Sequence, residues 1–211
     1  MHAGYPVTLR LVGKKVVVVG GGKVAERKVK GLLGTGAEIV VVSPEATEGI
    51  QGLHREGRIV WKQKLVAVSD LADAFMILVA TNNPQLNQSI KKTAEAHQLV
   101  TIADDPDGSN FHVPSHFSRG QLSIAVSTGG ASPTLAGKIR EQLEEQFDDS
   151  YESYLEFLSC KRKWILKEVE DATLKRKLLK TIVSSDFLTS ANREDDFIRL
   201  YEALLKETRQ S

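Results

Sequence analysis

The sequence contains one cysteine, Cys160, among its 211 residues. A single cysteine excludes an internal disulfide framework, and it excludes a cluster of thiolate metal ligands supplied by one chain. Sparse use of cysteine also suits a reducing compartment. We therefore expect a cytoplasmic protein.

Neither sign of charge is in excess, because 28 lysines and arginines stand against 27 acidic residues and the net charge is +1. Such a chain lacks a general electrostatic attraction for nucleic acid or for an anionic membrane. It also lacks an apolar run long enough to span a bilayer, and its first 15 residues lack the charged and apolar regions of a secretory leader. We expect small molecules and a second copy of the chain as partners, with no nucleic acid and no membrane.

The most informative stretch that is present covers residues 14–28 and reads KKVVVVGGGKVAERK. Its valines do not alternate with polar residues, which indicates a strand covered on both faces, as in a parallel α/β sheet. Gly20, Gly22 and Ala25 match the G-x-G-x-x-G/A spacing of a dinucleotide-binding turn. In such a turn the first glycine permits a sharp bend, the second lets a pyrophosphate approach the backbone, and the small third residue lets the helix pack closely on the strand.

Four further strand-like runs alternate with helix-like segments, at residues 38–42, 58–63, 75–80 and 99–103. This alternation predicts an α/β fold, namely a Rossmann-type doubly wound parallel sheet with the strand order 3-2-1-4-5. Ligands of such sheets bind outside the carboxyl ends of the strands. The residues that we predict to bind the cofactor therefore lie at these ends: Gly20, Gly21, Gly22, Lys23, Val24, Ser43, Pro44, Thr81 and Asn82.

One feature of a typical dinucleotide site is missing. The second strand ends in Ser43 and Pro44, where an acidic residue usually binds the adenosine ribose, about 20 residues beyond the glycines. These residues leave the choice between NAD and NADP open. Glycine-rich turns between a strand and a helix also occur where no ligand binds.

The pattern changes after residue 103. Residues 111–114 look extended, residues 121–128 form a strand-like run, and Ser132 with Pro133 opens a predicted helix over residues 134–147. From residue 148 onward apolar residues recur at helical spacing. We predict a small α/β segment over 113–147 and an all-helical C-terminal domain over 148–211.

Four segments together resemble the precorrin-2 dehydrogenase family of sirohaem synthesis, namely VVVVGGGKVAERK, VATNNPQLNQSI, TIADDPDGSNFHVPS and SIAVSTGGASPTLAGKIRE. The resemblance covers about residues 5–147, and STGGASP is far more specific than the glycine turn alone. It implies an NAD-dependent oxidation of precorrin-2 to sirohydrochlorin by a homodimer. Residues 1–112 would bind NAD, and residues 113–147 would form much of the dimer interface.

The resemblance also implies site residues. Asp104 matches the aspartate that the family associates with dehydrogenation and with metal insertion, so a sirohydrochlorin ferrochelatase activity in the same cleft stays open. Thr128 stands where several members have serine. The tetrapyrrole substrate carries eight carboxylates, which cations can bind through charge-assisted hydrogen bonds. The expected substrate-binding residues are His116, Arg119, Thr128, Gly129 and Ser132.

Each candidate residue also has a purely structural interpretation. Asp104 and Asp105 precede a proline, where an aspartate side chain commonly caps the N–H groups of a turn. Residues 127–132 have the composition of a connection between a strand and a helix with a good N-cap. His112 and His116 are four residues apart, but the proline between them prevents the helix that would aim both at one metal, so we expect no fixed metal site.

Two other functions stay open from the residues. A nucleotide-sensing module would bind NAD with the same turn to set the conformation of the helical tail, without chemistry. A chelatase or tetrapyrrole-binding protein would have lost the oxidation. Absorbance distinguishes these alternatives, because only the oxidation produces NADH together with a red shift of the tetrapyrrole.

We predict that Asp104 carries the proton chemistry of the oxidation. A hydride that leaves for the nicotinamide requires that a proton also leave the macrocycle, and a carboxylate at the end of the fifth strand suits that base. Asp104→Asn should lower turnover by roughly 10²- to 10⁴-fold and leave the NAD affinity nearly unchanged. Steady-state oxidation is the measurement, with single-turnover insertion of cobalt or iron followed separately.

Asp105→Asn is the local control for this experiment. Neighbouring residues of an extended chain point in opposite directions, so this change should alter turnover little. Near-normal oxidation by Asp104→Asn would exclude that residue as the base, whereas loss of insertion alone would assign it to chelation.

Overall fold

The computed structural model describes residues 4–103, 105 and 108–210, and for residues 208–210 only the backbone. The chain forms two compact units, Gly4–Val113 and the residues from Pro114 onward. Each unit contains its own hydrophobic core. The finer division of the second unit into a dimerisation segment and a helical domain stays a prediction.

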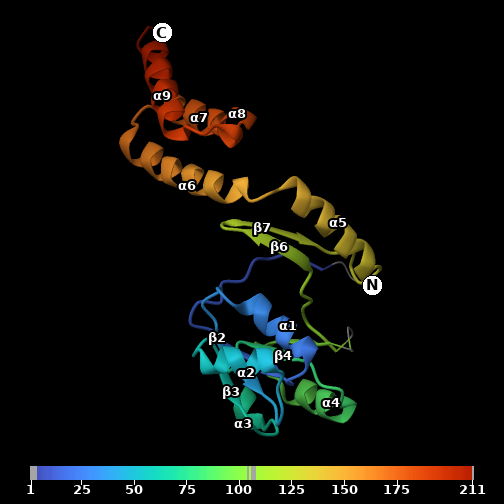
Figure 1. Cartoon of the computed structure of the whole chain (residues 1–211). Helices are drawn as coiled ribbons and strands as arrows, with labels where there is room; N and C mark the ends of the chain where they lie inside the picture. The colour runs from blue at the N-terminus through green and yellow to red at the C-terminus, as the bar shows by residue number, and fades with distance from the viewer. Residues whose placement is uncertain (1–3, 104, 106–107, 211) are drawn as a thin grey trace. The chain divides into compact units, whose positions relative to one another are not determined.

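The first unit, which runs from blue to green in Figure 1, contains a five-stranded parallel sheet. The strand order is β3-β2-β1-β4-β5. This confirms the predicted fold class and strand order. Strand β1 is Lys15–Val19, and β2, which is Glu38–Val42, has the predicted bounds. The other three strands are shorter than the predicted runs by one to three residues: β3 is Val60–Lys62, β4 is Met76–Val79 and β5 is Leu99–Ile102.

The central strand β1 is covered on both faces, as its unbroken valine run predicts. Val16 and Val18 belong to one cluster of buried residues with α1 and α2, which are Lys23–Leu32 and Glu48–Arg55. Val17 and Val19 belong to a second cluster with α3 and α4, which are Val68–Leu71 and Pro84–Thr93. Full burial of alternate valines on opposite faces is what keeps this strand at the centre of the sheet.

Two helices of the first unit are shorter than their sequence patterns predict. The pattern of residues 44–56 predicts a helix, but α2 begins at Glu48, because Thr47 caps it by accepting a hydrogen bond from the Ile50 N–H. The pattern of residues 84–97 predicts a helix, but α4 ends at Thr93. The reason is Gln98, which is buried, accepts from the Glu95 N–H at 2.9 Å and donates to the Leu71 and Ala74 carbonyls at 2.8 and 2.9 Å, so it fixes a turn there.

The second unit begins with a β-hairpin of β6 (Ser115–Arg119) and β7 (Leu122–Val126), followed by α5 (Pro133–Gln146). Gly120 has a φ of +52° and opens the two-residue turn between the strands. The sequence did not predict β6, because Phe117 is its only large apolar residue and is the one that becomes buried. A single buried residue gives no alternating pattern.

Four helices complete the second unit, namely α6 (Ser150–Glu168), α7 (Ala172–Thr181), α8 (Ser185–Thr189) and α9 (Arg193–Gln210). Trp164 packs edge to face with Phe197 and Tyr201, at ring-centroid distances of 5.5 and 5.2 Å. These ring contacts join α6 to α9, and Phe197 belongs to the hydrophobic core of the helices. Among the helices within the described residues, none combines the length and apolar composition needed to cross a bilayer.

Candidate functional site

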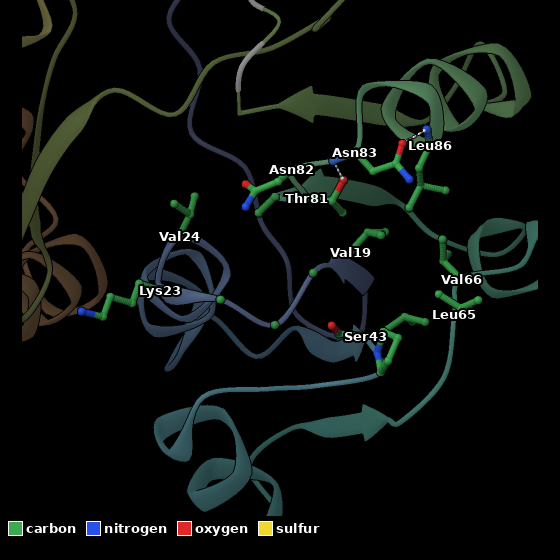
Figure 2. Close-up of a pocket in the computed structure, with 16 residues that line it drawn as sticks. Val19, Lys23, Val24, Ser43, Leu65, Val66, Thr81, Asn82, Asn83 and Leu86 are labelled. Atoms are coloured by element: carbon green, nitrogen blue, oxygen red, sulfur yellow. Dashed lines mark hydrogen bonds between the residues drawn. The ribbon is translucent and has the colours of Figure 1, made fainter.

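A pocket of about 450 Å³ lies at the carboxyl edge of the sheet in the first unit (Figure 2). Its walls come from the glycine turn after β1, the ends of β2 and β4, and the segment after β3. All nine residues predicted to bind the cofactor line this pocket, so residues from three separate parts of the sequence meet there: Gly20, Gly21, Gly22, Lys23, Val24, Ser43, Pro44, Thr81 and Asn82.

The first two glycines are required by the packing of the turn itself. Gly20 has a φ of +117°, and a Cβ there would lie 2.3 Å from the Ala80 carbonyl oxygen. A Cβ at Gly21 would lie 1.9 Å from the Glu45 carbonyl oxygen. The turn is therefore held tightly between the end of β4 and the loop after β2, and neither position accepts a side chain.

The third glycine faces open space. A Cβ at Gly22 would meet no heavy atom within 4 Å, and its φ of −81° is ordinary for any residue. Gly22 is also the N-cap of α1, and no side chain caps this helix. A side chain here would fill only the pocket, next to the first N–H groups of α1. This arrangement fits a pyrophosphate, which binds to such N–H groups and requires a close approach to the backbone.

The wall after β4 is held in place by Asn87, a buried residue of α4 that the sequence pattern did not predict for the site. The Thr81 hydroxyl donates to Asn87 Oδ1 at 2.6 Å and accepts from the Asn83 N–H at 3.2 Å. The Asn87 side chain in turn donates to the Thr81 carbonyl at 3.3 Å. These hydrogen bonds fix the conformation of Thr81 and thereby shape the wall of the pocket. The sequence signal for Asn87 was an asparagine on the inner face of a helix.

The wall after β3 was also missed, since Leu65 and Val66 line the pocket. Leu65 is 76% exposed, an unusual state for a leucine beside a cavity. The segment is fixed by Asp70, whose carboxylate accepts from the Ala67 N–H at 3.0 Å and pairs with Lys64 Nζ at 2.6 Å. Their position in the sequence could have predicted a place in the pocket, because these residues closely follow the carboxyl end of a strand.

Asp70 is almost completely buried, and Lys62 Nζ lies 3.1 Å from its second oxygen. Burial by itself would raise the pKa of this carboxyl. The hydrogen bonds from Lys64, the Ala67 N–H and Lys62 outweigh burial and lower the pKa to about 2. The side chain is therefore an anion at any physiological pH.

The five predicted substrate-binding residues all lie in the second unit, two on β6 and three in the loop before α5. His116 is exposed, and its Nδ1 lies 3.0 Å from the Pro114 carbonyl oxygen. The Thr128 hydroxyl accepts from the Ser132 N–H and donates to the Ser132 carbonyl, at 3.1 and 3.0 Å. Gly129, with a φ of +61°, lies between them. The Ser132 hydroxyl caps α5 by accepting from the Leu135 N–H at 3.1 Å.

These contacts agree with the simpler interpretation of this loop as a capped connection. They do not test the substrate roles, which stay predictions.

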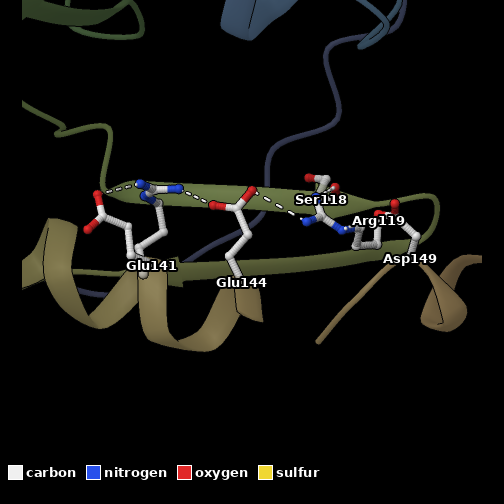
Figure 3. A network of polar contacts seen from close by, with 6 residues as sticks. Ser118, Arg119, Glu141, Glu144 and Asp149 are labelled. Carbon is white, nitrogen blue, oxygen red and sulfur yellow. Dashed lines mark hydrogen bonds and ion pairs between the residues drawn. The ribbon is translucent and has the colours of Figure 1, made fainter. Parts of the chain in front are cut away.

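Arg119 belongs to a network of ion pairs that joins β6 to α5 and to the start of α6 (Figure 3). Its Nε lies 2.8 Å from an Asp149 oxygen, and its Nη2 lies 3.5 Å from one Glu144 oxygen. The other Glu144 oxygen pairs with Arg140. The guanidinium lies 5.5 Å from the centre of the Phe117 ring. To bind a substrate carboxylate, as predicted, Arg119 would have to exchange acidic partners that it already has.

The predicted catalytic residue, Asp104, lies outside the described residues. Asp105 caps a turn, because its carboxylate accepts from the Gly108 N–H at 2.8 Å, as the simpler interpretation of that residue predicts. Among the described residues, no three histidine, cysteine or acidic side chains gather in a way that could hold a metal ion.

Comparison with known proteins gives matches over nearly the whole chain. Residues 7–115 match a family described as NAD(P)-binding, and residues 119–146 match the sirohaem biosynthesis protein central family. The chain is 38% identical over 198 residues to a precorrin-2 dehydrogenase of Priestia megaterium, covering 94% of this chain and 98% of that protein. It is 34% identical over 211 residues to a siroheme synthase of Xylella fastidiosa (strain M12), covering 98% of this chain and 44% of that longer protein.

A solved structure of SirC, a precorrin-2 dehydrogenase, matches with a TM-score of 0.81 and 38% identity. The match covers 95% of this chain and 100% of that one. The likeness therefore includes both compact units.

We predict that Gly22→Asp abolishes NAD binding in a folded protein. The new side chain meets no protein atom, so the fold should survive, but it places bulk and negative charge where the pyrophosphate would lie. Calorimetric titration with NAD is the measurement, with circular dichroism to establish folding.

Gly31→Asp is the matched control, because Gly31 is exposed on the same helix, has no heavy atom near its added Cβ, and does not line the pocket. It should bind NAD as the wild type does. Unchanged NAD affinity in a folded Gly22→Asp variant would remove the nucleotide site from this turn.

Proposed function

We propose, because this chain belongs to the precorrin-2 dehydrogenase family, that it catalyses the NAD-dependent oxidation of precorrin-2 to sirohydrochlorin in sirohaem biosynthesis. The single observation that supports the proposal is the pocket around Gly22, where open space meets the uncapped N-terminus of α1, an arrangement that suits a dinucleotide pyrophosphate. It lies in a chain with 38% identity to a precorrin-2 dehydrogenase of nearly the same length. We place the protein in the cytoplasm, which its sparse cysteine supports.

Each wall of the pocket suits one part of the cofactor. The N-terminus of α1 and the Lys23 side chain offer positive charge for the pyrophosphate. Ser43, at the end of β2, offers a hydroxyl to the adenosine ribose. The wall formed by Thr81 and Asn82 follows β4 and leaves polar groups for the nicotinamide half. When bound, NAD accepts two electrons as a hydride.

The oxidation removes two electrons and two protons from the tetrapyrrole. One proton leaves with both electrons as the hydride, which forms NADH, and the other proton needs a base. We assign this second proton to Asp104, at the end of the fifth predicted strand. The substrate carboxylates would contact the second unit through His116 and Arg119 and the loop at Thr128, Gly129 and Ser132.

The direct test mixes purified protein with precorrin-2 and NAD. We expect one NADH for each tetrapyrrole oxidised, with the NADH band and the red shift of the macrocycle rising together and neither appearing when one reactant is omitted. Saturable NAD binding without either change would contradict the proposal and favour a nucleotide-sensing module. A second arm with sirohydrochlorin and cobalt or iron measures whether the protein is also a chelatase.

We also propose that the functional unit is a homodimer formed through residues 113–147. Within α5, all of whose residues the structure describes, Ala136 is the one buried residue. The apolar side chains Leu122, Ile124 and Val126 of β7 are only partly buried, and Leu135 on α5 is 50% exposed. A second copy of the chain would cover these apolar surfaces, and a twofold dimer is the commonest arrangement.

We predict that light scattering at micromolar concentration gives twice the mass of the chain, and that Leu135→Glu weakens the dimer by roughly 100-fold because it places a charge in an apolar interface. Leu166→Glu on α6 is the control, since Leu166 is equally exposed, at 49%, but lies outside the proposed interface. A monomeric wild-type protein would refute the dimer, and equal effects of the two changes would refute its location.

A further inference from the structure

We propose that Asp70 makes the cofactor site select NAD over NADP, by holding Lys62 and Lys64 away from the adenosine end of the pocket. The inference rests on the proposed function, because it assumes that the pocket binds a dinucleotide. Asp70 itself does not line the pocket, so its role would be to position other charges.

The adenosine end is identified by the end of β2. In doubly wound sheets the residue at this place contacts the ribose hydroxyls, and an added 2′-phosphate is accommodated by a nearby cation. Here the residue is Ser43, which can hydrogen-bond to a hydroxyl but carries no charge. Ser43 therefore accepts either ribose, and selectivity depends on which cations can reach the phosphate.

Two lysines lie beside this end of the pocket. The Ser43 N–H donates to the Lys62 carbonyl at 3.2 Å, where β2 and β3 pair. Lys64 directly precedes Leu65, which lines the pocket. With their side chains turned toward the ribose, these are the cations that a 2′-phosphate would recruit, since an ammonium group binds phosphate strongly.

Both ammonium groups point instead to Asp70. Lys62 Nζ lies 3.1 Å from one carboxylate oxygen and Lys64 Nζ lies 2.6 Å from the other. The Asp70 side chain is 4% exposed, whereas the two lysine side chains are 41% and 46% exposed. A buried carboxylate that loses its partner is costly, so the lysines cannot leave for a phosphate without penalty.

The same carboxylate accepts from the Ala67 N–H at 3.0 Å, which gives it a structural role in the turn before α3. A purely structural role predicts that loss of Asp70 weakens both dinucleotides alike, through disorder of the Leu65 segment. Selection by charge predicts a different result, namely a gain for NADP alone. The two explanations therefore predict opposite changes in the NADP affinity when Asp70 is replaced.

The experiment is calorimetric titration of the full chain with NAD and with NADP, at two salt concentrations. In the wild type we expect NADP to bind at least about 10-fold more weakly than NAD. Asp70→Asn keeps the size and an acceptor for the Ala67 N–H but frees both lysines. It should raise the NADP affinity by roughly 5- to 20-fold, more at low salt, and change the NAD affinity less than about 2-fold.

Two controls distinguish an effect specific to Asp70 and its two lysines from a general effect of the protein's net charge. Asp73→Asn removes one exposed acidic charge just beyond α3 and should leave both affinities unchanged. Replacing Lys62 and Lys64 by methionine should abolish the gain in the Asp70→Asn background. In the wild-type background the same pair of changes removes both cationic partners of the buried Asp70 carboxylate, so circular dichroism must first establish that this variant folds. The folded variant should keep the wild-type NADP affinity, and a weaker NADP affinity would overturn the inference even if Asp70→Asn does not fold.

The inference is overturned if folded Asp70→Asn binds NAD normally without any gain for NADP, or if the lysine changes weaken NADP binding to the wild type. Either result leaves the proposed function intact, because NAD still binds. A wild type that binds neither dinucleotide would overturn both the inference and the proposed function.

Discussion

The pocket depends on the close approach of one backbone segment to two others. The carbonyl of Ala80 at the end of β4 and the carbonyl of Glu45 after β2 lie where a Cβ of Gly20 or Gly21 would be. Backbone hydrogen bonds support this close approach, since the Gly20 N–H donates to the Val42 carbonyl and the Thr47 N–H donates to the Gly21 carbonyl. The bend fixes where α1 begins, and the space beyond Gly22 exists because the turn before it is so tight.

Two buried polar side chains then hold other walls of the pocket. Asn87 fixes the segment at Thr81, and Asp70 fixes the segment at Leu65. Each makes two or more contacts with backbone, hydroxyl or charged groups, as a polar group removed from water must. The loops at the carboxyl edge of the sheet are thus tied down beside the pocket, which suits a site that must hold a cofactor in one orientation.

The second unit differs from the first in how its polar and apolar side chains are satisfied. Its polar side chains are already engaged, since Arg119 pairs with Glu144 and Asp149 and the Thr128 hydroxyl bonds to the Ser132 backbone. Its apolar side chains on β7 and α5 are less completely covered than the valines of β1. The central strand of the first unit is fully covered by its own helices, whereas the surface at residues 113–147 leaves apolar side chains such as Leu135 exposed.

The sequence by itself determined the sheet, its order and the pocket-lining residues that are local to strand ends. Unbroken valine runs, the glycine spacing and the position of Ser43 are local signals, and they are read without knowing any long-range contact. It did not reveal β6, whose single buried Phe117 has no periodicity. Only the tertiary structure decided which side chains are engaged, because Asn87, Asp70 and Arg119 find their partners 6 to 30 residues away along the chain.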